Sequence, residues 1–359
     1  MDEDPANNIH RDYKDPSGVS VTIRVMDKNL HTRDGNFSFV YRARVSQIFE
    51  DGAEQEPQLV ALKKVMIPRI KDFRELHILR HLVRYPHPNI IKLMFSQRRK
   101  YKIDYLQVVY TLVFEFIPTT LAKLKQEYFR DKNVIDIKLC IWQLFAGLHH
   151  LRELHIIHRD IKPANLLVNP KTGRLTIADF GSAIFLPSYP DVYQGTYAVT
   201  RYYRPPELIL GATRYNYVWS AGCIFAELYI GEALFAGANA FLQLQLIYNK
   251  LGTPSADDLK AMQVLEKDYI CAIRHQAIYP FGELFSIFEQ LKYPEESNPA
   301  KLIIKILDLN PKKRLFGRRL LSDRFFGELF QKGKKRNNGV LVADTISLEQ
   351  QKHILGTEI

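Results

Sequence analysis

Hydrophobic positions divide the chain into a strand-rich first third and a helical remainder. One segment of the first third, 71–83, has the helical spacing of apolar residues. From Pro118 onward helical periods dominate. Four segments are rich in β-branched and aromatic residues, which is typical of strands. They are "VSVTIRV" (19–25), "FSFVYRARV" (37–45), "LVALKKVMI" (59–67) and "VVYTLVFEFI" (108–117). The helical repeats are Phe73, Leu76, Leu79, Leu82 and Val83, and later Ile141, Leu144, Phe145, Leu148 and Leu151.

The change of period predicts an α+β fold in two parts, with a hinge near residues 115–119. We expect a disordered N-terminus over residues 1–18, which are polar and contain two prolines. An N-terminal lobe over 19–117 and a C-terminal lobe over 118–330 follow. The tail, 331–359, is rich in charge, Gly and Asn, and is expected to be loosely attached.

Composition is that of an ordinary globular protein. The chain has 359 residues, 46% of them hydrophobic and 25% charged, which suits two lobes with separate cores. Its net charge of +11 raises the question of nucleic acid, but the basic residues are dispersed, with short clusters only at 98–102, 312–319 and 332–336. Dispersed charge favours a solvated basic face that attracts phosphorylated or acidic partners, and we expect no nucleic-acid partner.

Cysteine usage and the first residues bear on the compartment. Three cysteines at wide spacing form neither a disulfide framework nor a zinc motif, which favours a reducing compartment. The start, "MDEDPANNIH", is acidic and polar, unlike a signal peptide. The most apolar long stretch, 218–248, contains Ser220, Glu227, Glu232 and Asn239, so it predicts buried helix and no membrane span. We expect a soluble protein that is cytoplasmic or nuclear.

Two short stretches contain the most specific chemistry. They are "HRDIKPANLL" (158–167) and "ADFGSA" (178–183). Phosphoryl transfer needs a carboxylate to orient the attacking hydroxyl, a cation beside the transferred group and two oxygen ligands for Mg²⁺. Asp160, Lys162, Asn165 and Asp179 supply these groups in that order. The alternative, polar loop residues that satisfy one another, does not account for all four at this spacing.

These stretches resemble the eukaryotic protein kinases, and the resemblance runs from about residue 22 to 330. "VALK" places Lys63 on a strand, where the family uses it to hold the α- and β-phosphates of ATP. Glu75 shares the inward face of the segment 71–83 with Leu79 and is the expected partner of Lys63. Glu207 in "PPE" resembles the glutamate that pairs structurally with a late arginine, here Arg314.

Further motifs narrow the resemblance. Lys162 is typical of serine/threonine kinases, and "TRYYRPPELILGA" (200–212) with "KLGTP" (250–254) is similar to the CMGC group. "KDFRELHIL", "DFGSA" and Tyr197 are most similar to glycogen synthase kinase 3. A mitogen-activated kinase would have Thr at Gly195, and a cyclin-dependent kinase another sequence at 71–79. The resemblance implies a two-lobed kinase fold, with a five-stranded antiparallel sheet and one main helix in the first lobe. It also implies transfer of the γ-phosphoryl of ATP to protein Ser or Thr, with Mg²⁺.

The resemblance also implies a nucleotide pocket. Adenine would lie between Thr32, Val40 and Ala61 on one side and Leu167 on the other. The backbone of Glu115 and Ile117 would bind it, and Phe114 would close the pocket behind it. Within the phosphate loop the family has three glycines, which fall on Arg33, Gly35 and Ser38 here. Because glycine allows backbone N–H groups close to phosphate, this predicts an active kinase with a weakened clamp.

Other departures concern regulation. The family holds a priming phosphate with three cations. The resemblance places two of them at Arg74 and Arg159, and Ile184 stands at the position of the third. Tyr197 resembles an activation-loop tyrosine that the family phosphorylates on itself, beside Arg201 and Arg204. Tyr217 stands where the family has an aspartate that supports the catalytic loop. The family's N-terminal inhibitory serine has no clear counterpart, because Ser17 has only Lys14 before it.

Competing hypotheses come from different classes. A pseudokinase scaffold with weak or no catalysis would fit the degenerate glycine loop, and another CMGC kinase would share most motifs. Expected partners are protein substrates, including pre-phosphorylated ones, and scaffold proteins on the C-terminal lobe.

Overall fold

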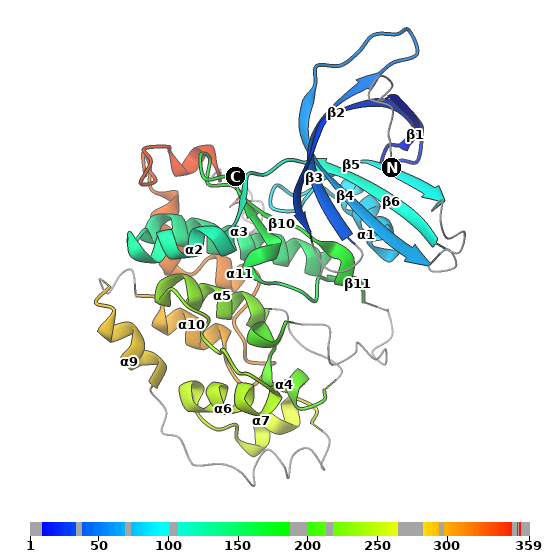
Figure 1. Cartoon of the computed structure of the whole chain (residues 1–359). Coiled ribbons are helices and arrows are strands. Elements are labelled where there is room, and N and C mark those ends of the chain that lie inside the picture. The colour runs from blue at the N-terminus through cyan, green and yellow to red at the C-terminus, as the bar shows by residue number, and fades with distance from the viewer. Residues whose placement is uncertain are drawn as a thin grey trace. The chain divides into compact units, whose positions relative to one another are not determined.

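A computed structural model describes residues 9–33, 38–68, 73–100, 107–186, 200–212, 218–264, 283–293, 298–346, 350 and 352. The chain divides into two compact units, residues 1–118 and 119–359, each described by itself (Figure 1). The division after Pro118 lies beside the boundary after residue 117 that the hydrophobic pattern predicts.

The first unit is an antiparallel barrel with one helix. Its strand order is β1-β2-β3-β4-β6-β5, and β1 pairs with both β2 and β5 so that the barrel closes. The strands are β1 (Ile9–Lys14), β2 (Ser20–Arg33), β3 (Ser38–Ile48), β4 (Gln58–Pro68), β5 (Leu93–Lys100) and β6 (Gln107–Glu115), and the helix is α1 (Arg74–Arg84).

Strand β1 corrects two expectations. Residues 9–14 lie within the N-terminus expected to be disordered, and they convert the expected five-stranded sheet into a six-stranded closed barrel. Tyr13 is 3% exposed and lies opposite Val21 and Gln97 in the two neighbouring strands. Asp12 accepts hydrogen bonds from Gln97 and Arg99 on β5. One buried ring and one paired carboxylate therefore hold a segment that is polar in composition.

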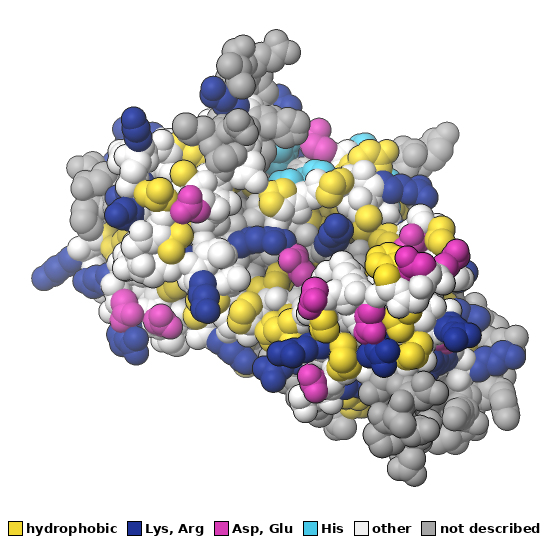
Figure 2. Space-filling view, turned by 90° about the horizontal axis from the view of Figure 1, so that it is seen from above, with side chains coloured by type: hydrophobic (Ala, Val, Ile, Leu, Met, Phe, Trp, Pro, Cys, Tyr) yellow, Lys and Arg dark blue, Asp and Glu magenta, His cyan; other side chains and the backbone are white. Residues whose placement is uncertain are grey.

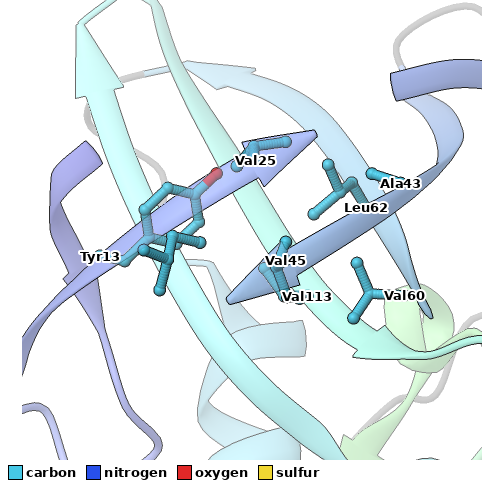
Figure 3. Packing of buried hydrophobic residues seen from close by; sticks show 8 residues of the cluster. Tyr13, Val25, Ala43, Val45, Val60, Leu62 and Val113 are labelled. Carbon is cyan, nitrogen blue, oxygen red and sulfur yellow. The ribbon is translucent and has the colours of Figure 1, made fainter. Parts of the chain in front are cut away.

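The barrel has an apolar interior. Figure 3 shows Tyr13, Val25, Leu62 and Val113 pointing inward from β1, β2, β4 and β6. Alternation along each strand places these side chains on one face, and closure of the barrel buries them together. At 25 cal/mol per Å², burying such a side chain contributes about 1.5–3 kcal/mol.

The second unit is mainly helical. Its helices are α2 (Leu121–Arg130), α3 (Val134–Glu153), α4 (Pro206–Ile209), α5 (Val218–Ile230), α6 (Ala240–Leu251), α7 (Ala256–Ala261), α9 (Glu283–Gln290), α10 (Ala300–Ile306) and α11 (Arg318–Leu321). Its short strands are β7 (Thr119–Thr120), β8 (Ile156–Ile157), β9 (Leu166–Val168), β10 (Leu175–Ile177) and β11 (Ile184–Phe185). Short 3₁₀ helices are Pro163–Asn165, Phe180–Ser182, Arg201–Tyr203, Arg324–Phe330 and Val342–Asp344.

Helices α3 and α5 form the centre of this unit and pack against each other (Figure 1). Both are buried around most of their circumference, as expected of helices that are apolar on nearly all sides. The prediction that residues 218–248 are buried helix is thus confirmed for α5. Within the described residues no helix is long and apolar enough to cross a membrane.

Residues 331–346 of the tail are packed against the second unit, so the expectation of a loosely attached tail is wrong for this segment. Val342 and Ile346 are buried, and Arg336 is 4% exposed. Arg336 forms an ion pair with Asp136 on α3, and Lys334 forms one with Glu328. The charge of this segment is therefore used in specific contacts with the rest of the unit.

Cys140 and Cys223 are both buried free thiols. Burial raises the pKa of Cys140 to about 12 and raises that of Cys223 well above its usual value. Neither thiol is activated as a nucleophile.

Candidate active site

The predicted catalytic loop, residues 158–165, follows β8, and hydrogen bonds of His158 anchor it. His158 is buried, and one ring nitrogen, Nε2, lies 2.9 Å from the carbonyl oxygen of Ala178. Because a carbonyl can only accept, Nε2 has the proton and Nδ1 is left to accept from the backbone N–H of Asp160 at 3.3 Å. His158 thus fixes the loop relative to the residues that follow β10.

Asp160 is oriented through both carboxylate oxygens. Oδ1 accepts a hydrogen bond from the hydroxyl of Thr200 at 2.6 Å. Oδ2 accepts from the amide of Asn165 at 3.0 Å and pairs with Lys162 Nζ at 2.8 Å. The side chain of Asp160 is 15% exposed, so it remains accessible. A carboxylate offers about four lone-pair positions, and these three donors, among the residues that the structure describes, leave one on Oδ1.

Asn165 and Asp179 supply oxygen ligands of the kind that Mg²⁺ binds. Asn165 Nδ2 donates to the backbone oxygen of Asp160 at 2.8 Å as well as to its carboxylate, which identifies the amide nitrogen and turns Oδ1 away from Asp160. Asp179 follows β10 in a left-handed conformation with φ 62°, and its Oδ1 accepts from Gly181 at 3.4 Å. The amide oxygen of Asn165, before β9, and the carboxylate of Asp179, after β10, are thus suitable ligands for a divalent cation.

The first unit contains the predicted Lys63–Glu75 pair. Lys63 lies on β4 and Glu75 in the first turn of α1, with Nζ and Oε1 2.8 Å apart. Both side chains are largely buried, 13% and 4% exposed. An amphipathic helix presents Glu75 on its inward face together with Leu76 and Leu79, as its helical pattern predicts, and the resemblance to the kinases named Lys63 as its partner.

The remaining predicted nucleotide residues fall in both units. In the first unit Thr32 and Val40 are paired across β2 and β3, and Ala61 lies opposite Phe114 across β4 and β6. Glu115 ends β6, just before Ile117, and Arg33 lies opposite Phe39. Leu167 lies on β9 in the second unit. Gly35, Tyr197 and Tyr217 lie outside the described residues.

Arg74 and Arg159 differ in their surroundings. Arg74, the first residue of α1, is exposed. Arg159 has a positive φ of 66°, and its Nε donates to the carbonyl oxygen of Ser182 at 2.6 Å. Ile184 lies on β11, paired with Ile157 on β8. Ile184, which stands at the position of the family's third cation, is therefore part of a small sheet that precedes the catalytic loop.

Thr200 and Glu227 were missed by the sequence reasoning. Glu227, fully buried on α5, accepts a hydrogen bond from the Tyr203 hydroxyl at 2.7 Å and pairs with Lys125 on α2. Burial and the neighbouring Glu227 raise the pKa of Tyr203, so the phenol keeps its proton. No local signal marks these contacts, because Thr200 lies 40 residues from Asp160 and Lys125 lies 102 from Glu227.

The predicted Glu207–Arg314 pair is present and completely buried. Arg314 Nη1 and Nη2 donate to the two oxygens of Glu207 at 2.5 and 2.7 Å, and both side chains are 0% exposed. The guanidinium also lies 4.8 Å from the ring centroid of Trp219 on α5. This pair links α4, which follows the Thr200–Tyr203 segment, to the segment after α10.

Comparison with known proteins agrees with this geometry. Residues 34–326 match the protein kinase domain family. A protein of Pyricularia oryzae named "Glycogen synthase kinase 1" is 35% identical over 304 residues, covering 82% of this chain and 71% of that protein. "Protein kinase gsk3" of Schizosaccharomyces pombe is 36% identical over 287 residues, covering 77% and 70%. The chain therefore belongs to the protein kinase family, as a serine/threonine kinase similar to the glycogen synthase kinases.

Proposed function

We propose that the chain is catalytically active and transfers the γ-phosphoryl of ATP to Ser and Thr hydroxyls of proteins with Mg²⁺. The observation that carries the proposal is the oriented carboxylate of Asp160. Its one open lone pair on Oδ1 can accept the hydrogen bond of a substrate hydroxyl. A silent scaffold would not need a carboxylate held by three donors yet still accessible.

The chemistry follows from the groups around that oxygen. The substrate oxygen forms a bond to the γ-phosphorus, the bond to the bridging oxygen of ADP breaks, and the hydroxyl proton passes to Asp160. Lys162, beside Asp160, offers positive charge to the transferred group. Asn165 and Asp179 would hold Mg²⁺, which supplies charge neutralisation of the phosphates when it is bound.

The nucleotide contacts of the first unit support the same proposal. A Lys63 held by a buried Glu75 has a defined position from which to bind the α- and β-phosphates. Within this unit, Val40 and Ala61 on the barrel would contact adenine. Arg33 and Ser38 in place of glycines would weaken the clamp, while Asp160, Lys162, Asn165 and Asp179, the groups proposed to perform the transfer, are all retained in the sequence.

The test is phosphate transfer by the full chain and by Asp160→Asn, which keeps the size of the side chain. We expect turnover to fall by about 10²–10⁴-fold, with nucleotide affinity nearly unchanged. Asp131→Asn is the control, because that exposed carboxylate pairs with Arg130 on the surface. An unmodified chain that transfers no phosphate would identify a scaffold. Full activity of Asp160→Asn would refute the assigned role.

The glycine loop permits a second experiment. If crowding by side chains limits nucleotide binding, Arg33→Gly and Ser38→Gly should each tighten it, as we expect. If the charge of Arg33 helps to bind phosphate, Arg33→Gly should weaken binding by roughly 1.5–3 kcal/mol. Titration of ATP against both single variants separates these outcomes, and unchanged affinity in both would exclude the two accounts.

We further propose that Tyr197 is phosphorylated. A phosphate would add nearly two negative charges near Arg201 and Arg204. Arg201 lies in the 3₁₀ turn after Thr200 and donates to the carbonyl oxygen of Ala238 at 2.6 Å. Peptide mass spectrometry of an active preparation tests this, and an unmodified Tyr197 there would remove the proposal.

A nucleic-acid-binding function has less support. On the face shown in Figure 2, Lys and Arg side chains are interspersed with acidic and hydrophobic ones and do not merge into one patch. A basic stripe would be the expected electrostatic footprint of a nucleic-acid site. Retention of an oligonucleotide that weakens steeply with salt would favour that function instead.

A further inference from the structure

The tail contacts the turn that joins β9 to β10. Each carbonyl oxygen of residues 170–173 accepts a hydrogen bond from a side chain outside the turn. Arg336 donates to Pro170 and Lys171 at 3.1 and 2.8 Å, and Asn338 donates to the same two oxygens. Thr345 donates to Thr172. The fourth oxygen, of Gly173, accepts from Gln143 on α3 at 2.9 Å.

Arg336 is fitted closely to its place. Its Nε lies 2.5 Å from Oδ1 of Asp136 on α3, whose other oxygen accepts from Asn133 at 2.7 Å. Gly173 has a φ of +79°, and a Cβ there would lie 2.7 Å from the guanidinium carbon. The absence of a side chain at Gly173 thus leaves room for Arg336. The guanidinium connects α3 and the β9–β10 turn to the tail.

The other end of the same hairpin holds the proposed metal ligands. Asn165 precedes β9, Asp179 follows β10, and the backbone N–H of Ala178 donates to the carbonyl oxygen of Asn165 at 2.9 Å. The pairs Val168–Leu175, Leu167–Thr176 and Leu166–Ile177 join the two ends. At about 3.3 Å per residue, the turn lies about 17–20 Å from the ligands along the strands.

We propose that Arg336 is a positioning residue for the metal site, through which the C-terminal tail holds the β9–β10 hairpin and thereby the spacing of Asn165 and Asp179. The proposal rests on the function proposed above. The hairpin has three paired residues per strand, and β9 adds two pairs with β7, Thr119–Val168 and Thr120–Leu167. This is a small set of bonds, so contacts of the tail with the turn further restrict how the other end can tilt. Gln143 also binds both Gly173 and Leu175, so α3 and the tail restrain the turn from two sides.

The experiment uses the full chain and two variants, called hold variants below, that each remove part of the contact between the tail and the β9–β10 turn. Arg336→Lys keeps a cation beside Asp136 but loses the planar set of donors that reaches both carbonyls. Asn338→Ala combined with Thr345→Val removes the other two donors and leaves the buried ion pair intact. Lys334→Ala is the matched control, because Lys334 lies in the same tail but pairs with Glu328, away from the turn.

Two measurements separate positioning from simple stabilisation. The first is the Mg²⁺ concentration that half-saturates the thermal shift produced by ADP, which requires no turnover. Losing a residue that orients a metal ligand commonly costs 10–100-fold in affinity. Arg336 acts one layer further out, so we expect an increase of about three- to tenfold in both hold variants and none in Lys334→Ala. The second is amide hydrogen exchange, which should accelerate in residues 165–180 but not in α5.

The result that overturns the proposal is wild-type Mg²⁺ dependence in both hold variants, even if their melting temperatures fall. Uniform acceleration of exchange across both the hairpin and α5 would also overturn it, because this marks a general loss of stability. Asn165→Ala tests the underlying function separately. If neither the unmodified chain nor this variant responds to Mg²⁺ with ADP, the proposed function itself fails, and the positioning role fails with it.

Discussion

Thr200 donates its hydroxyl hydrogen to Oδ1 of Asp160 at 2.6 Å, across 40 residues of sequence. The contact ties the segment before the Arg201–Tyr203 turn to the carboxylate that we expect to orient the substrate. It also occupies one lone pair of Oδ1, and the described residues leave the other for an incoming hydroxyl.

Replacing Thr200 should therefore impair turnover more than binding. In Thr200→Val the shape is kept but the donor to Asp160 is lost. A hydrogen bond to a charged group contributes about 1.5–3 kcal/mol, so we expect kcat to fall by roughly ten- to a hundredfold. Thr200→Ser should retain most activity because it keeps the hydroxyl. Steady-state kinetics of both variants check this, and equal losses in Val and Ser would contradict the role of the hydroxyl.

Breaking the Glu207–Arg314 pair should destabilise the second unit strongly. Arg314→Met leaves a fully buried carboxylate without its partner, and such changes cost about 3–5 kcal/mol. Denaturant unfolding measures the loss. Arg130→Met is the control, because Arg130 is largely exposed and its pair with Asp131 should contribute little. A small effect at Arg314 would mean that water or another cation reaches Glu207.

His149 on α3 should make stability depend on pH. Burial lowers its pKa below 6.5; Glu153 opposes the shift, while Arg318 and Arg152 add to it. The unfolded chain therefore takes up a proton first as the pH falls below 6.5, so the folded state loses stability from there down to the folded pKa. We expect His149→Gln to remove this loss. Unfolding free energies of both proteins at about pH 7.5 and pH 5 should differ in slope. Parallel profiles would show that His149 remains well solvated.

Ile184 should reduce the benefit of a substrate that is already phosphorylated. The family resemblance predicts three cations around a priming phosphate, and Ile184 on β11 offers neither charge nor a hydrogen bond. One missing charged contact weakens binding by about 1.5–3 kcal/mol, or roughly ten- to a hundredfold. We expect Ile184→Lys to raise the ratio of kcat/KM for one peptide with and without the priming phosphate. Ile184→Met is the matched control without charge. An unchanged ratio in Ile184→Lys would show that no such phosphate site exists here.

Short-range patterns predicted the catalytic loop and the two-part division, and together with the resemblance to the kinases they predicted the Lys63–Glu75 pair. Asp160 and Asn165 are five residues apart in one loop, and Asn165 donates directly to Asp160. Glu75 lies on the apolar face of a helix whose period is visible in the sequence. Asp160 and Asn165 are thus neighbours in the chain, and the helical period places Glu75 on an inward face, while the resemblance to the kinases named Lys63 as its partner.

Contacts between distant segments were decided only by the tertiary structure. Tyr13 is buried because β1 closes a barrel with strands on both sides, although the first residues are polar in composition. Arg336 lies in a charged tail that composition assigns to solvent, yet it is buried against Asp136, 200 residues away. A charge can be buried when an opposite charge and carbonyl oxygens satisfy it, and local sequence does not reveal those partners. For the same reason the sequence predicted Asn165 and Asp179 as metal ligands but not the tail that contacts their hairpin.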